Sequence, residues 1–547
     1  MLEPVFYDIG RICKEKNVPN TPDSPKYTPK FIDFNIDIPP LGMLKVPFDC
    51  PKEVAEELME LNRQETGKIG DLKYQIINFG KYFDLANVED ADLYVVADGR
   101  RLIKRRELIE IIPKLREKIS PNSGIYFPGA LPWEIPLLVY LGVDYFDSTS
   151  AKYYASLGCK FTKNRMISTK KSFKELCEYN ESVLEDILEE VKYCIKEGSL
   201  RNLVEETTVS DPYLRANYRR YTPDIRNIPL SKGKKIMVTI DETRIPEVKK
   251  YIERAKNYDP FTNVVVLLPC SSKKPYSYSK SHQLFINAIN SAGFPVEELI
   301  LTSPYGVVPR ALEGVVDYDI PVTGEWSTEE IEFINKYLRN YIERAKNKFG
   351  DVKIIAHLPE HYMEILDLEN LDYIKTAEDN PTSDESLRNL KDTLKEIKNE
   401  YLKDTDLGTK HQQRIHNYQE LAKFQFGKNF IPDDVVVKGR HRKFFIKKDG
   451  KQIQICSLNE ENGLFVLTAD AGELLGKVNW VEVNFEVKKG GSLFAPGFKD
   501  CDENISVNDE VVIVKDDKVI GVGRALMSGA EMKKARHGAL VNIRHIK

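Results

Sequence analysis

The sequence predicts a multidomain α/β protein that ends in a β-rich module. The chain has 547 residues, more than a single hydrophobic core usually organises. Two long blocks alternate buried-strand patterns with amphipathic helices, as in the strand "DLYVVAD" at 92–98 and the helix that follows it at 105–119. Nearer the C-terminus, short strands and glycine turns replace this alternation. Strand–helix alternation predicts mostly parallel sheets in the first two blocks.

The pattern along the chain divides it into four parts. We expect domains at residues 1–225, 226–380, 381–474 and 475–547. The first two are α/β, with strands of the second expected at 235–240, 263–269, 298–303 and 351–359. A stretch rich in Tyr, Arg and Pro at 213–234 is predicted to link them. The third part should be a highly charged helical bridge at 383–428 followed by a small α+β domain, and the fourth should be β-rich.

Composition narrows the classes of function. The net charge is −4, so a polyanionic partner would need a local basic patch. The eight cysteines are scattered without a CxxC or CxC pair, so no metal site is expected and zinc least of all. With no signal peptide and no apolar run near about twenty residues, we expect a cytoplasmic protein that makes no membrane contact.

The stretch "PCSSKKPYSYSKSH" at 269–282 brings several reactive side chains into one turn. Cys270 follows an expected parallel strand, and open α/β sheets bind ligands beyond the carboxyl ends of their strands. A helix should begin near Ser279, and its N-terminus together with Lys274 would favour a thiolate. His282 has the side chain that most often transfers protons near neutral pH. Alternatively, Cys270 is a buried apolar residue, Ser279 caps the helix, and the lysine is solvated.

Residues 475–547 resemble the PUA domain, a small β-barrel that binds RNA. The resemblance rests on "KKGGSLFAPGF" and on "DEVVIVKDDKVIGVGRALMSG". It implies glycines that let a phosphate approach the backbone and cations that neutralise the phosphate. The residues expected to contact RNA are Lys488, Lys489, Gly490, Gly491, Arg524, Arg536 and Arg544. A plain β-barrel with solvated charges is the alternative.

The first block is similar to the catalytic (β/α) barrel of the tRNA-guanine transglycosylases, in a shortened form. The stretch "PGALPWEIPLLVYLGVDYFDSTSAKYYA" at 128–155 carries the similarity. In that family, the aspartate that matches Asp147 is the nucleophile that attacks the ribose, from the carboxyl end of a barrel strand. The family's CxCxxC zinc pattern is missing here. Alternatively, Asp147 only caps the helix that begins near Ala151.

The pattern PC-x3-KPY-x2-S-x2-H at 269–282 is similar to the signature of the archaeosine synthases, archaeal paralogues of the transglycosylases. The stretch "LTSPYGVVPRALEG" and the later "TGEW", within 301–326, also match this family. The resemblance implies an enzyme that converts the nitrile of 7-cyano-7-deazaguanine, at position 15 in the D-loop of tRNA, to a formamidine. Lysine, glutamine or ammonia would donate the amine, and no cofactor is required. A radical-SAM partner enzyme would cleave a lysine adduct, and a homodimer is left open.

This resemblance assigns expected roles. Cys270 would attack the nitrile as a thiolate and His282 would transfer protons. Lys274 would hold an anionic group, and Tyr276 would stack on the deazaguanine. The expected catalytic residues are Cys270, Lys274, Ser279, His282 and Asp147, and the expected substrate contacts are Tyr276, Tyr305, Arg310, Glu325 and Trp326. Two other functions remain open, namely base exchange at Asp147 and tRNA binding without catalysis.

Overall fold

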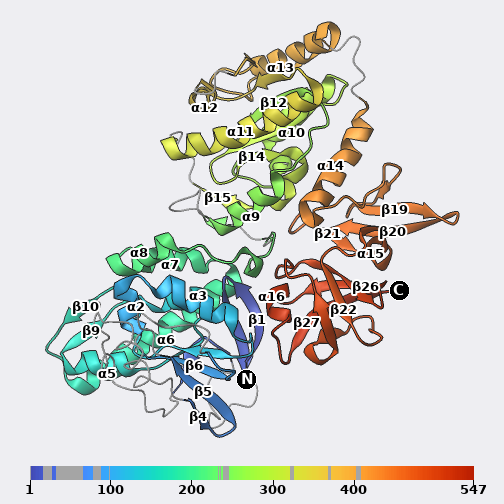
Figure 1. Cartoon of the computed structure of the whole chain (residues 1–547). Helices are drawn as coiled ribbons and strands as arrows, with labels where there is room; N and C mark the ends of the chain where they lie inside the picture. The colour runs from blue at the N-terminus through green and yellow to red at the C-terminus, as the bar shows by residue number, and fades with distance from the viewer. Residues whose placement is uncertain are drawn as a thin grey trace, which may run out of the picture. The chain divides into compact units, whose positions relative to one another are not determined.

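A computed structural model describes most of the chain (Figure 1). The described residues are 2–15, 27–32, 66–77, 88–97, 99–231, 233, 236–237, 245–320, 326–367, 371–401 and 408–547. The chain forms two compact units. Unit 1 comprises Met1–Ile228, Ser492–Val507 and Ala525–Asn542, and unit 2 comprises Pro229–Gly491, Asn508–Arg524 and Ile543–Lys547. No helix in the described part of the chain is both long enough and apolar enough to cross a membrane.

Unit 1 is built on a six-stranded sheet with the order β3-β8-β7-β6-β5-β4. Its strands are β3 (Lys30–Phe31), β4 (Thr66–Ile69), β5 (Leu72–Ile77), β6 (Leu93–Val96), β7 (Gly124–Tyr126) and β8 (Tyr145–Phe146). Neighbours from β3 to β5 run parallel, and only β4 is antiparallel. The strand predicted within 92–98 is confirmed by β6. Over the described residues the sheet is an open row, so the expected closure into a barrel is not seen in this part of the chain.

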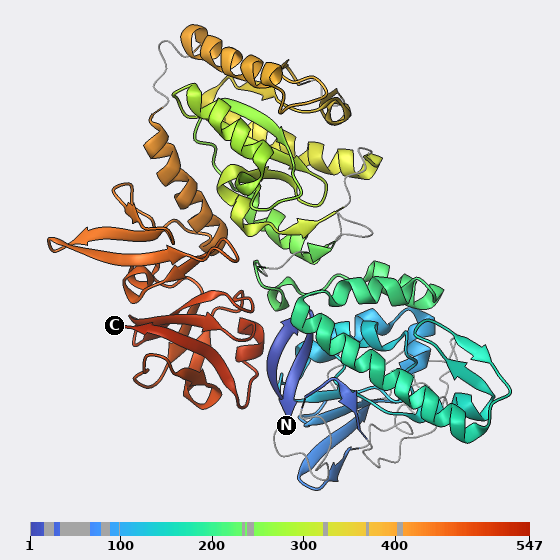
Figure 2. The same cartoon turned by 180° about the vertical axis from the view of Figure 1, so that it is seen from behind.

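Helices and two hairpins complete the N-terminal part of unit 1. They are α2 (Gly99–Arg105), α3 (Leu108–Lys118), α4 (Ile135–Tyr140), α5 (Thr149–Ser156), α6 (Phe173–Glu197), α7 (Leu200–Thr208) and α8 (Pro212–Arg220), with hairpins of β1 (Leu2–Asp8) and β2 (Gly10–Glu15) and of β9 (Cys159–Phe161) and β10 (Met166–Ser168). The long helix α6 begins with a reciprocal cap between Ser172 and Glu175. Figure 2 shows α6 in teal, with the β9–β10 hairpin at the margin of the unit.

The predicted linker at 213–234 is wrong in its first part, because α8 occupies it. The Asp211 carboxylate accepts hydrogen bonds from the backbone N–H groups of Tyr213 and Leu214 at 2.8 and 3.0 Å. Pro212 follows at the first helical position, where its fixed φ suits a helix and its missing N–H is not needed. Leu214 is fully buried. The Asp-Pro start signal therefore outweighs the polar composition that suggested a linker.

Unit 2 contains a five-stranded sheet with the order β14-β13-β12-β16-β17. Its strands are β12 (Val264–Pro269), β13 (Glu297–Thr302), β14 (Gly306–Pro309), β16 (Lys353–Ala356) and β17 (Tyr373–Lys375). All neighbours are parallel except β14, which confirms the predicted α/β class. The helices are α9 (Pro246–Ala255), α10 (Lys280–Ser291), α11 (Thr328–Phe349) and α12 (Met363–Asp367), and β11 (Ile236–Met237) pairs separately with β15 (Tyr318–Asp319). The central strand β12 is an apolar run, buried as parallel sheets require.

The helices predicted as a bridge at 383–428 are instead part of a core. They are α13 (Asp384–Glu396), the π-turn η7 (Ile397–Tyr401) and α14 (Lys410–Phe426). Leu390 and Leu394 of α13 are fully buried, and they share one hydrophobic cluster with β12. Charged residues dominate the sequence here because they cover the opposite face of each helix. A small antiparallel sheet of β18 (Val436–Lys438), β19 (Lys443–Lys448), β20 (Lys451–Leu458) and β21 (Phe465–Leu467) follows, with helix α15 (Ala469–Leu475).

The C-terminal module is a six-stranded sheet with the order β23-β27-β26-β25-β22-β24. Its elements are β22 (Trp480–Val483), β23 (Ser492–Phe494), η8 (Ala495–Gly497), β24 (Phe498–Cys501), β25 (Glu510–Lys515), β26 (Lys518–Ala525), α16 (Gly529–Met532) and β27 (Ala539–Ile546). The β-rich prediction for this part is confirmed. Gly490, in the turn before β23, has a φ of +73°, which a glycine adopts without strain.

Candidate active site

Cys270 lies immediately after β12, at the carboxyl edge of the unit 2 sheet. Its side chain is partly buried. The hydroxyl of Tyr362 donates a hydrogen bond to the Cys270 Sγ atom at 3.4 Å and accepts one from the Cys270 backbone N–H, also at 3.4 Å. Tyr362 ends the short helical turn η6 (Glu360–Tyr362), which follows the neighbouring parallel strand β16. Two adjacent strand ends therefore bring the thiol and the phenol together.

Tyr362 is a site residue that the sequence analysis missed. It is 3% exposed, and burial, followed by the proximity of Cys270, raises the pKa of its hydroxyl well above the usual value. The phenol therefore stays protonated and acts as a donor toward sulfur. The available signal was its position, since "HLPEHY" comes directly after a buried strand of the same sheet.

Trp326 packs against Tyr362. Its ring meets the Tyr362 ring edge to face, with the centroids 5.0 Å apart. The buried indole Nε1–H has no hydrogen-bond partner among the described residues, and such a donor is usually satisfied. Glu325, the other expected contact in this stretch, lies outside the described residues. Trp326 remains a candidate substrate contact.

His282 is held in a way that corrects its predicted role. It is fully buried, its Nε2–H donates to the Pro269 carbonyl oxygen at 3.0 Å, and its Nδ1 accepts from Arg310 at 2.9 Å. Burial, followed by the charge of Arg310, lowers the pKa of His282 to about 3. Both ring nitrogens are engaged by protein partners and burial favours the neutral ring, which argues against the predicted proton transfer and favours a role in positioning the chain next to Cys270.

Ser279 follows the alternative interpretation. Its side-chain oxygen accepts from the His282 backbone N–H at 3.2 Å, which makes it the N-cap of α10. Lys274 places its ammonium 3.7 Å from the centroid of the Tyr318 ring, within the range of a cation–π contact. Its predicted role in holding an anionic group stays a prediction.

Two expected substrate contacts, Tyr276 and Tyr305, are buried among other side chains. Tyr276 is fully buried and its hydroxyl lies 2.8 Å from that of Tyr318, so it presents no face on which a base could stack. Tyr305 is 4% exposed and packs against Tyr251 with ring centroids 5.0 Å apart. Local sequence could not report these directions, because a motif fixes spacing and leaves open which way each side chain points.

Arg310, another expected substrate contact, has a side chain that is 15% exposed and lies at the centre of an ion-pair network. Its guanidinium bonds Glu298 at 2.6 Å and Glu313 at 2.7 Å, in addition to His282. Glu313 also accepts from the Ser277 backbone N–H at 2.9 Å. The network joins the turn η5 (Arg310–Val315) to the loop that follows Cys270. The motif therefore mostly fixes the end of β12, and Cys270 is the side chain that it presents.

Asp147 lies in unit 1, directly after β8. One carboxylate oxygen accepts from the backbone N–H groups of Gly129 at 3.0 Å and Thr149 at 2.9 Å, and the other accepts from the Tyr126 hydroxyl at 2.6 Å. Thr149 is the first residue of α5, so the capping alternative is supported. These three donors hold the carboxylate in place. A role for Asp147 in chemistry stays a prediction.

The cations predicted to bind RNA divide into exposed and paired groups. Lys488, Lys489, Gly490 and Arg524 are exposed, and Gly491 is partly exposed. By contrast, Arg544 forms an ion pair with buried Glu510, whose pKa burial raises to about 7. Arg536 bonds Asp90 and Asp92, and all three residues belong to unit 1. Much of the charge of Arg536 and Arg544 is therefore neutralised inside the protein.

One group of metal-capable side chains occurs among the described residues, formed by Asp259, His416 and Glu420. Both Asp259 oxygens bond Lys348, at 2.8 and 2.9 Å. Glu420 bonds Lys423 at 2.6 Å, and the His416 Nε2–H donates to the Asp259 carbonyl oxygen at 2.7 Å. These groups already have protein partners, two of them cations, so the arrangement is a polar network rather than a metal centre.

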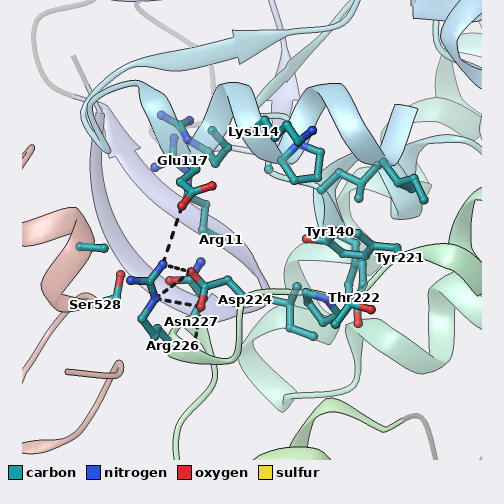
Figure 3. A pocket seen from close by; sticks show the side chains of 18 of the residues that line it. Arg11, Lys114, Glu117, Tyr140, Tyr221, Thr222, Asp224, Arg226, Asn227 and Ser528 are labelled. Atoms are coloured by element: carbon teal, nitrogen blue, oxygen red, sulfur yellow. Dashed lines mark hydrogen bonds and ion pairs between the residues drawn. The ribbon is translucent and has the colours of Figure 1, made fainter. Parts of the chain in front are cut away.

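Unit 1 contains a cavity of about 510 Å³ next to α3, η2 (Ile225–Asn227) and α16 (Figure 3). On its wall, Arg226 pairs with Asp224 at 2.7 Å and reaches Glu117 at 4.0 Å. The rings of Tyr140 and Tyr221 meet edge to face, with centroids 5.8 Å apart. None of the predicted site residues lines this cavity, and its charged groups largely neutralise one another.

The chain combines a thiol at the carboxyl edge of an α/β sheet with a β-rich C-terminal module. This combination defines the class of protein, an α/β enzyme with a PUA domain. The family model of the PUA domain matches residues 477–547, and that of a domain of unknown function (DUF5591) matches residues 248–394. Archaeosine synthase of Methanocaldococcus jannaschii is 56% identical to the chain, over all of both proteins. The chain belongs to the archaeosine synthase family.

Two further proteins are similar to the chain in sequence. Archaeosine synthase subunit alpha of Thermococcus kodakarensis is 34% identical, over 85% of this chain and 82% of that protein. A tRNA-guanine(15) transglycosylase of Methanothermobacter thermautotrophicus is 26% identical, over 80% of this chain and 68% of that protein. The predicted relation to the transglycosylases is therefore confirmed in sequence, and so is the predicted PUA domain.

Proposed function

We propose that this chain is an archaeosine synthase, an enzyme that modifies tRNA by converting the nitrile of 7-cyano-7-deazaguanine at position 15 to a formamidine. The observation that carries the proposal is full-length identity of 56% to a protein of that name. The PUA domain is consistent with an RNA substrate, and the Cys270–Tyr362 pair supplies a nucleophile where α/β sheets bind their ligands.

The proposed chemistry uses the thiol twice. First, the Cys270 sulfur bonds to the nitrile carbon while the thiol proton goes to the nitrile nitrogen, which gives a thioimidate. The amine then attacks the same carbon, the carbon–sulfur bond breaks, and the sulfur regains a proton from the incoming amine. The products are a formamidine and the original thiol, so no oxidant or reductant is needed. The nitrile is a sluggish electrophile, and splitting one hard addition into two steps lowers the barrier.

Tyr362 supports both steps of this scheme. Its hydroxyl donates to sulfur in the resting enzyme, and a donor to sulfur stabilises the thiolate that attacks and later leaves. Trp326, whose ring packs against Tyr362, is the candidate for contacting the base in this scheme. Lys274 remains the candidate for holding an anionic group of the donor or of the tRNA backbone.

The donor and the partners remain part of the proposal. Lysine, glutamine or ammonia would supply the amine, and a lysine adduct would need a radical-SAM partner to release the formamidine. A relative called subunit alpha fits the expectation that some members work with a second chain. Light scattering of the full chain tests whether two copies associate.

The test uses tRNA that carries 7-cyano-7-deazaguanine, incubated with the full chain and lysine, glutamine or ammonium in turn. Digestion and mass spectrometry of the nucleosides then identify the product. A nucleoside heavier by one lysine or by one ammonia supports the proposal and names the donor. Loss of the base would indicate exchange chemistry instead, and unchanged nucleoside with every donor would overturn the catalytic role.

A further inference from the structure

The segment 148–174 has an unusual charge for this chain. It contains seven basic residues and no acidic one, although the whole chain has a net charge of −4. It forms α5, the β9–β10 hairpin and the start of α6, at the margin of unit 1 in both views (Figure 1, Figure 2). The segment begins one residue after Asp147, so it lies beside the carboxyl edge of the unit 1 sheet.

Several of these cations are available to a partner. Lys152, Arg165 and Lys170 are exposed, and none of them forms an ion pair with a described residue. By contrast, Lys163 is paired with Glu190 at 2.8 Å. The available charges therefore sit on three different elements, namely α5, the hairpin turn and the loop before α6.

Exposed apolar side chains lie between the cations. Tyr153 is 58% exposed, Phe173 is 55% exposed and Ile167 is 49% exposed. Solvent-exposed rings among unpaired cations are the combination that binds single-stranded or looped nucleic acid, because bases stack on rings while cations neutralise phosphates. A face that was only solvated would gain nothing from the exposed rings.

The segment is also held rigidly enough to act as one surface. The Asn180 side chain of α6 accepts from the Phe161 backbone N–H at 2.7 Å and donates to the Cys159 carbonyl oxygen at 3.0 Å. The Thr169 N–H bonds the Gly158 carbonyl oxygen at 2.9 Å, which closes the base of the hairpin. Asn180 also donates to the Ala151 carbonyl oxygen of α5 at 3.4 Å, so the backbones of α5 and of the hairpin are both tied to α6.

We propose that this surface, the basic platform formed by Lys152, Tyr153, Arg165, Ile167, Lys170 and Phe173, binds the substrate tRNA through its backbone and through unstacked bases. The proposal rests on the proposed function for the identity of the RNA. A second copy of this chain is the competing occupant. A symmetric dimer would place this patch against itself and oppose like charges, whereas a polyanion is attracted. Arg536 and Arg544 of the PUA domain are already in ion pairs, so cations on the platform would add to the phosphate contacts that Lys488, Lys489 and Arg524 can make.

The test measures binding of unmodified tRNA to the full chain by fluorescence anisotropy over a range of salt concentrations. The variant is Lys152→Ala/Arg165→Ala/Lys170→Ala. The matched control is Lys104→Ala/Arg105→Ala/Lys114→Ala, which removes the same number of exposed positive charges elsewhere in unit 1. We expect the platform variant to weaken binding at least about tenfold near 0.1 M salt and to lower the log–log salt slope by about two to three, while the control changes both little.

Equal effects in the two variants, or none in either, would overturn the proposal. So would a platform variant that changes the oligomeric state by light scattering without changing tRNA affinity, since that result would assign the surface to a second copy. Unmodified tRNA has no nitrile, so the measurement is independent of the chemistry. If the platform variant binds tRNA as tightly as the parent chain and still converts the nitrile, only the platform is contradicted. If tRNA binding depends on the platform but the parent chain does not convert the nitrile, only the proposed function is contradicted.

Discussion

The two units place a chemically reactive type of side chain at the same position of a similar sheet and give it different partners. Asp147 follows β8 in unit 1, and Cys270 follows β12 in unit 2. The two carboxylate oxygens of Asp147 together accept hydrogen bonds from three donors. Within the part of the chain that the structure describes, the Cys270 sulfur accepts a hydrogen bond from the Tyr362 hydroxyl alone. A strand end thus offers a place for chemistry, and the partners of the side chain decide whether it is anchored or available.

The sharpest test of this contrast removes the thiol. We expect Cys270→Ser to reduce nitrile consumption by at least about a thousandfold, because an alcohol is a far weaker nucleophile near neutral pH. Nucleoside mass spectrometry gives the rate, and tRNA affinity should not change. Cys194→Ser, at another partly buried free cysteine, is the control. Full turnover by the Cys270 variant would exclude the covalent route.

Removing the hydroxyl of Tyr362 tests why the thiol is reactive. Tyr362→Phe deletes the donor to sulfur and should lower kcat by about 10- to 100-fold with little change in KM for tRNA. Because the thiolate loses a stabilising hydrogen bond, the rising limb of the pH–rate profile should move to higher pH. Tyr278→Phe, at an exposed tyrosine of the same motif, should have neither effect. A lower rate with an unmoved profile would mean that Tyr362 only fills space.

His282 allows a test based on stability and pH. Its pKa is about 3 in the folded protein and about 6.5 when unfolded. The unfolded chain therefore binds the proton first as the pH falls below about 6.5, so the stability from neutral His282 is present above that pH and is lost toward pH 3. At pH 5 the loss from this residue is about 2 kcal/mol.

Thermal unfolding at pH 7 and pH 5 checks this sign. His282→Gln should be less stable than the parent at pH 7 and should lose less stability on acidification. His411→Gln, at an exposed histidine, should behave like the parent. An unchanged pH dependence in the His282 variant would show that the ring is not held neutral.

The smallest effect is expected at Asp147. Asp147→Asn keeps the shape of the cap and removes its charge, so turnover should stay within about threefold and stability should fall by about 1 kcal/mol. Tyr126→Phe removes one donor to the same carboxylate and should act similarly. A collapse of turnover in the Asp147 variant, measured with the same nucleoside assay, would break the contrast between the two units and make unit 1 a second catalytic centre.

Local patterns predicted the elements and the position of the thiol. The apolar run of β12 and the residue after it are short-range features, so Cys270 could be placed at a sheet edge from sequence. The partners could not be placed in this way. Tyr362 is 92 residues from Cys270 along the chain, and the acids that hold Arg310 belong to β13 and η5. Tyr276 was misread because spacing says nothing about whether a ring faces solvent or core.

Because of the network around Arg310, two separate segments of the chain together hold Cys270 in place. His282 bonds the carbonyl oxygen next to Cys270, and Arg310 connects that ring to Glu298 and Glu313. Anyone who wished to build this thiol into another sheet would have to transplant residues 269–282 and 298–313 as one set. Either piece alone would bring a buried imidazole or a buried guanidinium into a host that has nothing to bond it.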